Sequence, residues 1–234
     1  MRGGVSALLA SIKLFLGNPL IRTVLKHAIK KTRCLYTEDF ESHSIIYHAL
    51  SKYAGTEIYC PIGAEFSIDL INIAIKLGIR ILGGDDKDVV DLLKDPAIRR
   101  GLESVLKSIA LYGVTAPQKL FAPFMVVWNF TNMCNLRCLH CYQKADRPLP
   151  SELSLKEKLR IVEEFDDFGI AAIALSGGEP TIHPDYLAIV KAAARRGMYV
   201  ATATNGWRFA DLDELKKAVD VGLRYVEVSI DSAY

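Results

Sequence analysis

The sequence lacks a long uninterrupted apolar stretch, which argues against a membrane-spanning helix. Such a helix needs about 20 consecutive apolar residues, whereas the most apolar run is interrupted by Asp69, Lys76 and Arg80. An export signal is also missing, because Lys13 splits the first apolar segment and no small-residue cleavage site follows it. We therefore expect a cytoplasmic protein without a transmembrane segment.

A large charge of one sign is absent as well. The chain has 29 basic and 27 acidic residues, a net charge of +2, so it has no general attraction for nucleic acid. Residues 1–33 are the exception, since they carry seven Lys and Arg residues and no acidic residue. Two interpretations are open, a contact with an anionic membrane or RNA, and a solvated face of packed helices, and the second is simpler.

Cysteine is scarce and unevenly distributed. Of the five cysteines, three lie within residues 134–141. An odd number with three clustered fits poorly with a disulfide framework and well with a reducing compartment that leaves thiolates free to bind metal. Cys34 and Cys60 stand apart, and we expect each to be a small buried apolar residue rather than a ligand.

Residues 1–114 have the apolar spacing of helices, with apolar positions three or four residues apart. The predicted helices cover residues 5–16, 20–31, 44–53, 66–77, 88–94 and 97–112. This pattern predicts a small all-α domain. Residues 115–123 contain two prolines and little periodicity, which is typical of an extended linker.

Residues 124–234 change to a pattern of alternating strands and helices, which predicts an α/β domain. Short β-branched or aromatic runs predict buried parallel strands at residues 124–131, 170–175, 199–204 and 224–230. Helices are predicted between them. Consecutive βα units give either an open doubly wound sheet or a partial TIM-like barrel with about four strands. In both folds the functional loops lie at the carboxyl ends of the strands.

The predicted helices of this domain also have start signals. Ser154 with Glu157, and Asp211 with Glu214, have the spacing of a capping box, in which each pair satisfies free amides at a helix start.

The loop after the first predicted strand carries the strongest chemical signal. Cys134, Cys138 and Cys141 form the spacing CxxxCxxC. Three soft thiolates in one loop can hold an iron–sulfur cluster or a zinc ion. With no fourth cysteine nearby, a cluster would keep one iron without a protein ligand. His140 raises the alternative of a Cys3His zinc site.

The other predicted strands also end in polar or glycine-rich sequences. The second strand is followed by Ser-Gly-Gly-Glu-Pro at residues 176–180, the third ends in Thr-Asn-Gly at 204–206, and the fourth ends in Ser-Ile-Asp at 229–231. Because the carboxyl ends of parallel strands meet at one edge of a sheet, we expect these sequences to face one cavity.

Together, CxxxCxxC after a first strand and GGEP after a second resemble the radical S-adenosylmethionine (radical SAM) superfamily, over residues 124–234. The resemblance implies that Cys134, Cys138 and Cys141 ligate three irons of a [4Fe-4S] cluster and that SAM chelates the fourth. It also implies reductive cleavage of SAM to methionine and a 5′-deoxyadenosyl radical that abstracts hydrogen from a substrate. An electron donor such as ferredoxin or flavodoxin is then required. The substrate is not evident.

The resemblance further implies a set of residues around SAM. The absence of side chains at Gly177 and Gly178 would let the backbone approach the methionyl group, and Glu179 would add a charge or orient the loop. The remaining implied contacts are Thr204, Asn205, Ser229, Asp231, His140 and Tyr142. All of these are predicted to bind the cofactor, and the catalytic residues are not evident from the sequence.

Radical SAM folds usually continue to about six βα units, whereas this sequence stops at Tyr234, just past the fourth predicted strand. A truncated or split coding sequence explains this, as does a second polypeptide that completes the barrel. The sequence from Trp128 to Cys141 is similar to the branch that modifies peptides or matures tetrapyrrole and quinone cofactors.

Two functional hypotheses follow. The chain is an enzyme, or the cofactor-binding half of one, that performs radical SAM chemistry. Alternatively it is a catalytically inert fragment that binds zinc or a cluster and has an interaction role.

Overall fold

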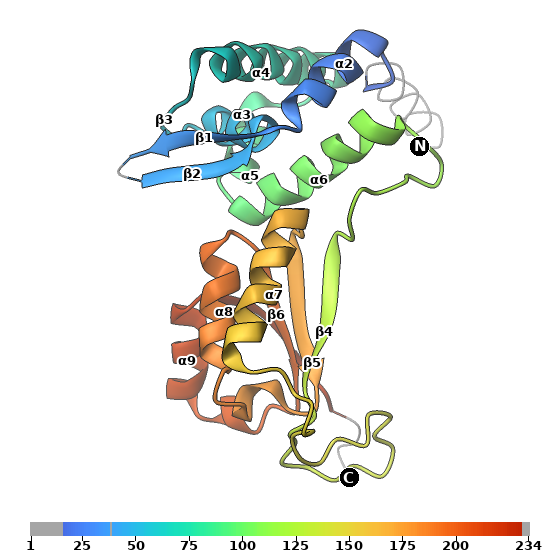
Figure 1. Cartoon of the computed structure of the whole chain (residues 1–234), viewed down its shortest axis with the longest axis vertical. Coiled ribbons are helices and arrows are strands. Elements are labelled where there is room, and N and C mark those ends of the chain that lie inside the picture. The colour runs from blue at the N-terminus through green and yellow to red at the C-terminus, as the bar shows by residue number, and fades with distance from the viewer. Residues whose placement is uncertain (1–15, 38, 231–234) are drawn as a thin grey trace. The chain divides into compact units, whose positions relative to one another are not determined.

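The computed structural model describes residues 16–37 and 39–230, which divide into two compact units between Phe121 and Ala122 (Figure 1). We call them the N-terminal unit and the core unit. Within the described residues, no helix is both long and apolar enough to cross a membrane. The extent of the predicted linker, residues 115–123, stays a prediction.

Five helices make up most of the described N-terminal unit. They are α2 (Pro19–Ala28), α3 (Ile45–Tyr53), α4 (Ile62–Leu82), α5 (Asp86–Leu93) and α6 (Pro96–Tyr112). Polar side chains cap four of them: Asn18, Ser44, Asp85 and Asp95 each accept a hydrogen bond from an amide of the first turn. The helices predicted from periodicity are found here, except residues 5–16, which lie outside the described residues apart from Leu16.

The N-terminal unit is not all-α, and this part of the prediction is wrong. Strands β1 (Lys31–Tyr36), β2 (Asp39–Ser44) and β3 (Ile58–Tyr59) form an antiparallel sheet in the order β2-β1-β3. Both longer strands are rich in polar residues and only six residues long, and β3 has only two. They therefore lack the apolar run by which a buried strand is detected in a sequence.

A disulfide joins Cys34 of β1 to Cys60, the residue that follows β3. The prediction that each is a separate small buried apolar residue is therefore wrong in missing this bond, although Cys34 is fully buried. The register explains the bond: Leu35 lies opposite Tyr59, which brings the preceding residue of β1 opposite the residue after β3. The Cα atoms are 4.5 Å apart, the spacing of directly opposed residues in an antiparallel pair.

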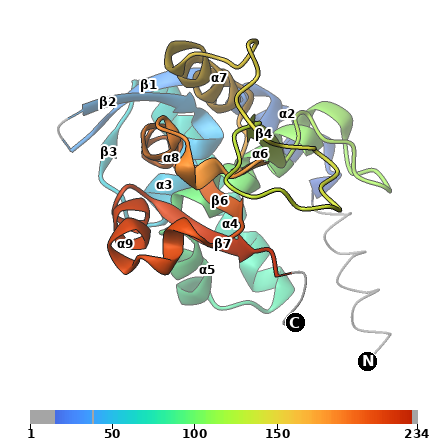
Figure 2. The same ribbon diagram turned by 90° about the horizontal axis from the view of Figure 1, so that it is seen from below.

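The core unit is a four-stranded parallel sheet with helices on one face, which confirms the predicted α/β class (Figures 1 and 2). The strands are β4 (Met125–Thr131), β5 (Ala172–Gly177), β6 (Tyr199–Thr204) and β7 (Leu223–Val228), in the order β4-β5-β6-β7. The helices are α7 (Leu155–Phe168), α8 (Tyr186–Arg195) and α9 (Leu212–Asp220), with single 3-10 turns η1 (Pro180–Ile182) and η2 (Arg208–Ala210). This arrangement is consistent with the predicted partial barrel.

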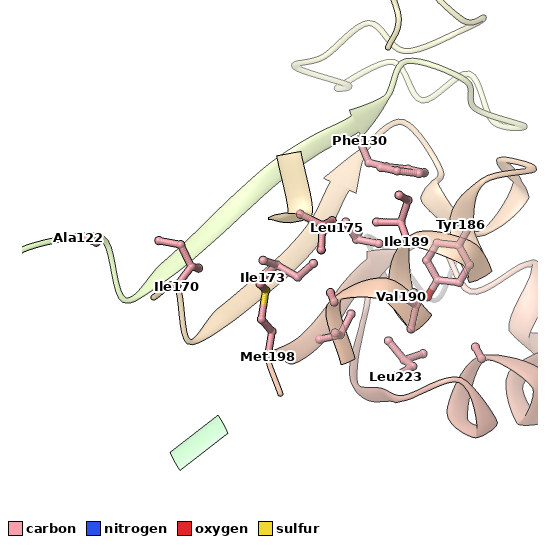
Figure 3. Packing of buried hydrophobic residues seen from close by; sticks show 14 residues of the cluster. Ala122, Phe130, Ile170, Ile173, Leu175, Tyr186, Ile189, Val190, Met198 and Leu223 are labelled. Carbon is pink, nitrogen blue, oxygen red and sulfur yellow. The ribbon is translucent and has the colours of Figure 1, made fainter. Parts of the chain in front are cut away.

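One row of apolar residues crosses the sheet and forms the base of the core. Val126, Ile173, Val200 and Leu223 pair in register across the four strands. Ile173 and Leu223 of this row belong to the same buried cluster as Ile189 of α8 (Figure 3). Full burial of one such side chain contributes roughly 1.5–3 kcal/mol.

The strands present their other side chains to the opposite face of the sheet. On β4, Met125 and Val127 alternate with the buried row and remain 51% and 61% exposed. In a barrel this face lines the interior.

Of the two predicted capping boxes, one is complete and the other is only partly formed. Ser154 and Glu157 form the complete capping box at the start of α7. At α9, Asp211 accepts from the amide of Asp213, but the side chain of Glu214 pairs with Arg208 and Lys217. The second capping box is therefore only half formed, because two cations compete for the glutamate.

Candidate metal and cofactor site

The cysteine-bearing loop leaves the carboxyl end of β4 and is closed at its neck by backbone contacts. The amide of Cys134 donates to the carbonyl of Asp146 at 3.3 Å, and the amide of Asp146 donates to the carbonyl of Asn132 at 3.0 Å. Arg137 pairs with the carboxylate of Asp146 and donates to the carbonyl of Cys134 at 3.0 Å. The segment between the first cysteine and Asp146 is thus held as a closed loop.

Glu152 anchors the root of this loop, a role that the sequence did not suggest. One carboxylate oxygen accepts the amide of Asn132 at 2.6 Å, and both oxygens lie 3.1 Å from the hydroxyl of Thr131. The same carboxylate accepts the amide of Leu149 at 3.4 Å. It therefore joins both ends of the loop to the end of β4.

The three cysteines of the loop are free and open to solvent. Cys134 and Cys141 are half-buried, and Cys138 is exposed. The amide of Cys141 donates to the carbonyl of Cys138 at 3.1 Å, which forms a tight turn between these two cysteines. The amide of Leu136 donates to the sulfur of Cys134 at 3.4 Å. The thiols are therefore presented by a shaped backbone rather than buried in a core.

The spacing and chemistry of these thiols bear on which metal group they fit. Among the residues that the structure describes, one group of three His, Cys, Asp or Glu donors lies within 4.8 Å of one another, and it is in the N-terminal unit. The loop instead offers three free cysteines on one short segment. Three soft thiolates are a donor set that fits three irons of an iron–sulfur cluster, and thiolates also bind zinc.

The glycine-rich loop after β5 packs directly on the chain that leads into the first cysteine. The amide of Gly178 donates to the carbonyl of Thr131 at 2.8 Å, and the amide of Glu179 donates to the carbonyl of Met133 at 2.7 Å. A side chain at Gly178 would overlap the carbonyl of Met133, and Gly177 has a φ of +109°. These contacts alone explain why the loop needs glycine. The role of both glycines toward SAM stays a prediction.

Glu179 orients the loops from inside the protein. Its side chain is fully buried. It accepts from the amide and hydroxyl of Thr181 at 3.1 and 2.6 Å, from the hydroxyl of Thr204 at 2.8 Å and from the amide of Asn205 at 2.6 Å. Of the two predicted roles, these contacts match loop orientation, because the carboxylate joins the end of β5 to the end of β6.

Asn205 extends this link to the cysteine loop. Its side-chain amide donates to the side-chain oxygen of Asn135 at 2.9 Å, between the first and second cysteines. Thr204 is buried, and its hydroxyl also accepts the amide of Gly206 at 3.0 Å. The structure thus brings the ends of β4, β5 and β6 together through hydrogen bonds.

Of the four remaining predicted SAM contacts, three are exposed and one lies outside the described residues. Ser229 is exposed, and its amide donates to the carbonyl of Thr204 at 2.9 Å. His140 is exposed and Tyr142 is 84% exposed, on either side of Cys141. Asp231 lies outside the described residues. The roles of these four residues stay predictions.

The sequence did not predict a buried lysine, Lys158, that contacts Asp185 and His183. Lys158 of α7 is 1% exposed and donates to Asp185 at 3.0 Å. Its ammonium also lies 3.1 Å from His183 Nε2. Burial and, next, the positive charge of Lys158 lower the pKa of His183. The ring of His183 packs against Phe130, and its backbone amide donates to the carbonyl of Pro180 in η1 at 3.1 Å.

Comparison with known proteins identifies the same part of the chain. The sequence profile of the Radical SAM superfamily matches residues 128–234. Fe-coproporphyrin III synthase of Methanosarcina barkeri is 42% identical over 108 residues, which are 46% of this chain and 27% of that protein. Pre-heme d1 synthase of Dinoroseobacter shibae is 36% identical over 108 residues, 46% of this chain and 26% of that protein.

A third relative, the mycofactocin maturase MftC of Mycobacterium tuberculosis, is 31% identical over 114 residues, 49% of this chain and 29% of that protein. The chain thus spans less than a third of the length of these relatives. The crystal structure of Streptococcus suis SuiB bound to S-adenosylmethionine has a TM-score of 0.42 and 15% identity, over 84% of this chain and 45% of that chain.

Proposed function

Residues 128–234 belong to the radical SAM superfamily, and on this premise we propose that the core unit is the cofactor-binding part of a radical SAM enzyme. Members of the superfamily bind a [4Fe-4S] cluster and SAM. When bound, the cluster supplies the electron that cleaves SAM reductively and so starts radical chemistry on a substrate. Cys134, Cys138 and Cys141 would hold three of its irons.

The observation that carries the proposal is the bonding between the cysteine loop and the neighbouring strand ends. Gly178 and Glu179 bind the backbone before Cys134, and Asn205 binds Asn135 within the motif. A cluster held on this loop would lie beside the ends of β5 and β6. SAM, bound at the open iron, would then meet the same edge of the sheet.

Apart from the three cysteines, the residues of this chain would position the loops and the cofactors rather than react themselves. Glu179 fixes the position of the β6 end by accepting from Thr204 and Asn205. Glu152 fixes the root of the cysteine loop. We propose that backbone groups of Gly177 and Gly178 contact the methionyl end of SAM. We assign His140, Tyr142, Thr204, Asn205, Ser229 and Asp231 to the remainder of its surroundings.

The substrate and partners are proposals for the whole protein to which these residues contribute. Two relatives are named for coproporphyrin and heme and a third for mycofactocin. These names support a cofactor precursor as the substrate class, with a tetrapyrrole favoured over a peptide. Reductive cleavage of SAM needs a low-potential electron donor, for which a ferredoxin or flavodoxin is suitable. A cytoplasmic location, which keeps thiols reduced, agrees with these requirements.

The test is anaerobic reconstitution of the chain with iron and sulfide. We expect brown protein with about four irons per chain and formation of 5′-deoxyadenosine from SAM when dithionite is added. Colourless protein with one zinc ion that is lost in the Cys138→Ala variant would instead support the inert metal-binding fragment. Iron binding without SAM cleavage would limit the function of these residues to holding the cluster.

A further inference from the structure

The N-terminal unit contains a second group of metal-ligating side chains that the core chemistry does not use. One donor atom each from Cys34, His48 and Cys60 lies within 4.8 Å of the other two. Cys34 and His48 are fully buried, and Cys60 is half-buried. The three residues come from β1, from α3 and from the position after β3. Three separate segments of the chain thus converge on one point.

His48 is fixed in this place by its two ring nitrogens. Nε2 lies 3.0 Å from the carbonyl of Thr32 on β1, and Nδ1 lies 2.6 Å from the hydroxyl of Tyr36. Because a carbonyl only accepts, Nε2 carries the proton, and Nδ1 accepts from the tyrosine. Histidines that bind metal typically donate their other ring N–H to a backbone carbonyl in this way.

We propose that reduction of the Cys34–Cys60 disulfide converts this group into a site for one Zn²⁺ ion. The two sulfurs and His48 Nδ1 are the ligands, and Nδ1 exchanges the hydroxyl of Tyr36 for the metal. Two thiolates and one imidazole suit zinc, and a water completes the tetrahedral set.

The reaction balances with a dithiol as the reductant. The disulfide accepts two electrons and two protons from the dithiol, which is itself oxidised to a disulfide. Cys34 and Cys60 are then free thiols. Zinc binding releases one proton from each as the two S–Zn bonds form.

A zinc ion at this site would keep β3 attached to β1, because the sheet itself joins these two strands at few positions. β3 pairs with β1 at only two positions, Leu35 with Tyr59 and Tyr36 with Ile58. The covalent link between Cys34 and Cys60 adjoins these pairs and fixes the chain just before α4. The reducing conditions of the proposed function would open that link, and this consequence alone rests on the proposed function. Zinc would then hold the same two strands together.

Cobalt(II) titration of the full-length chain tests the proposal. Cys134, Cys138 and Cys141 are replaced by alanine, so that the cysteine loop does not compete for metal. The protein is reduced anaerobically with a dithiol and freed of reductant. We expect one equivalent of Co²⁺ to produce thiolate-to-cobalt absorption and intense tetrahedral bands, which Zn²⁺ abolishes. The oxidised protein should show neither band.

Matched variants identify the ligands. Cys34→Ser and His48→Gln should each weaken cobalt binding at least tenfold, whereas His43→Gln, which changes a histidine ring 5.8 Å from that of His48, should not. Tyr36→Phe removes the competitor for Nδ1 and should bind cobalt at least as tightly. Reduced protein with native circular dichroism and no tetrahedral bands would overturn the proposal. So would equal binding before and after reduction.

If the triple alanine variant does not fold, the original sequence gives the same answer by difference. Native mass spectrometry of the reduced chain should then show one more bound zinc than Cys34→Ser under identical conditions. Equal zinc counts would overturn the proposal. None of these measurements requires the cluster or SAM, so they remain informative if the proposed function fails.

Discussion

The two units use cysteine in opposite ways. In the N-terminal unit, Cys34 of β1 lies opposite Cys60, the residue after β3, and the two are joined to each other. In the core unit, the three cysteines lie on a loop and are free, with Cys138 exposed and the other two half-buried. Strands position a pair through register alone, whereas a loop needs added anchors, here Glu152, Gly178 and Asn205. The first pair is therefore bonded to itself, whereas the loop cysteines are held in place as free thiols that can bind a metal group.

The largest expected effect separates the two cysteine groups directly. Cys138→Ala should reduce cluster iron to background after reconstitution, because a cluster on two thiolates is not retained. Cys60→Ser removes a cysteine from the other unit and should leave the iron content unchanged. Iron and sulfide assays on both variants make the comparison. Equal iron loss in the two would contradict the division of roles.

Removal of the buried Glu179 carboxylate, which links the ends of β5 and β6, should have the next largest effect. Glu179→Ala leaves the hydroxyl of Thr204 and the amide of Asn205 without their buried acceptor. We expect the free energy of unfolding of the core unit to fall by about 3 kcal/mol. Urea unfolding followed by tryptophan fluorescence reports on this unit, since both tryptophans, Trp128 and Trp207, belong to it.

Glu164→Ala is the control for that experiment. Glu164 is exposed and pairs with Arg160 on one helix, so its loss should change the free energy of unfolding by less than about 0.5 kcal/mol. A Glu179 variant as stable as this control would show that the buried carboxylate is not an anchor.

A glycine substitution tests how closely the two loops pack. Gly178→Ala places a methyl group against the carbonyl of Met133 and should displace the cysteine loop. We expect iron occupancy to fall at least twofold. Gly63→Ala lies in α4 with no atom within 4 Å of an added Cβ, and its iron occupancy should be normal. Normal occupancy in Gly178→Ala would mean that the loops move independently.

The smallest predicted effect is a pH dependence confined to the core unit. Burial and Lys158 hold the pKa of His183 below its ordinary value, so the unfolded chain takes up the proton more readily than the folded one. The stabilising contribution is complete above about pH 6.5 and is lost as the pH falls through the lower folded pKa. Tryptophan-monitored unfolding between pH 7.5 and pH 5 measures it.

His183→Gln should flatten this pH profile, because glutamine does not titrate in that range. An unchanged slope in the variant would assign the dependence to another group.

The core unit was predictable from the sequence for physical reasons. Its strands are short runs rich in β-branched and aromatic residues, and the Ser154–Glu157 capping box marks the start of α7, so local signals agree with the fold. The cysteine motif was equally visible, because its three residues are neighbours in the chain.

The features that the sequence did not show depend on register and tertiary contact. The bond between Cys34 and Cys60 follows from which residues of β1 and β3 face each other, and strand register is not determined by two isolated cysteines. Glu152 acts on residues 20 positions earlier, and no local pattern marks it. Glu179 was found as a site residue, but its engagement with Thr204 and Asn205 requires the folded sheet.

The central claim is a cluster on Cys134, Cys138 and Cys141 with one iron open to SAM. Electron paramagnetic resonance of the reduced, reconstituted chain, recorded with and without SAM, tests it most directly. The account predicts a [4Fe-4S]⁺ signal whose g-values change when SAM is added. A signal that does not respond to SAM, or no cluster signal at all, would contradict it.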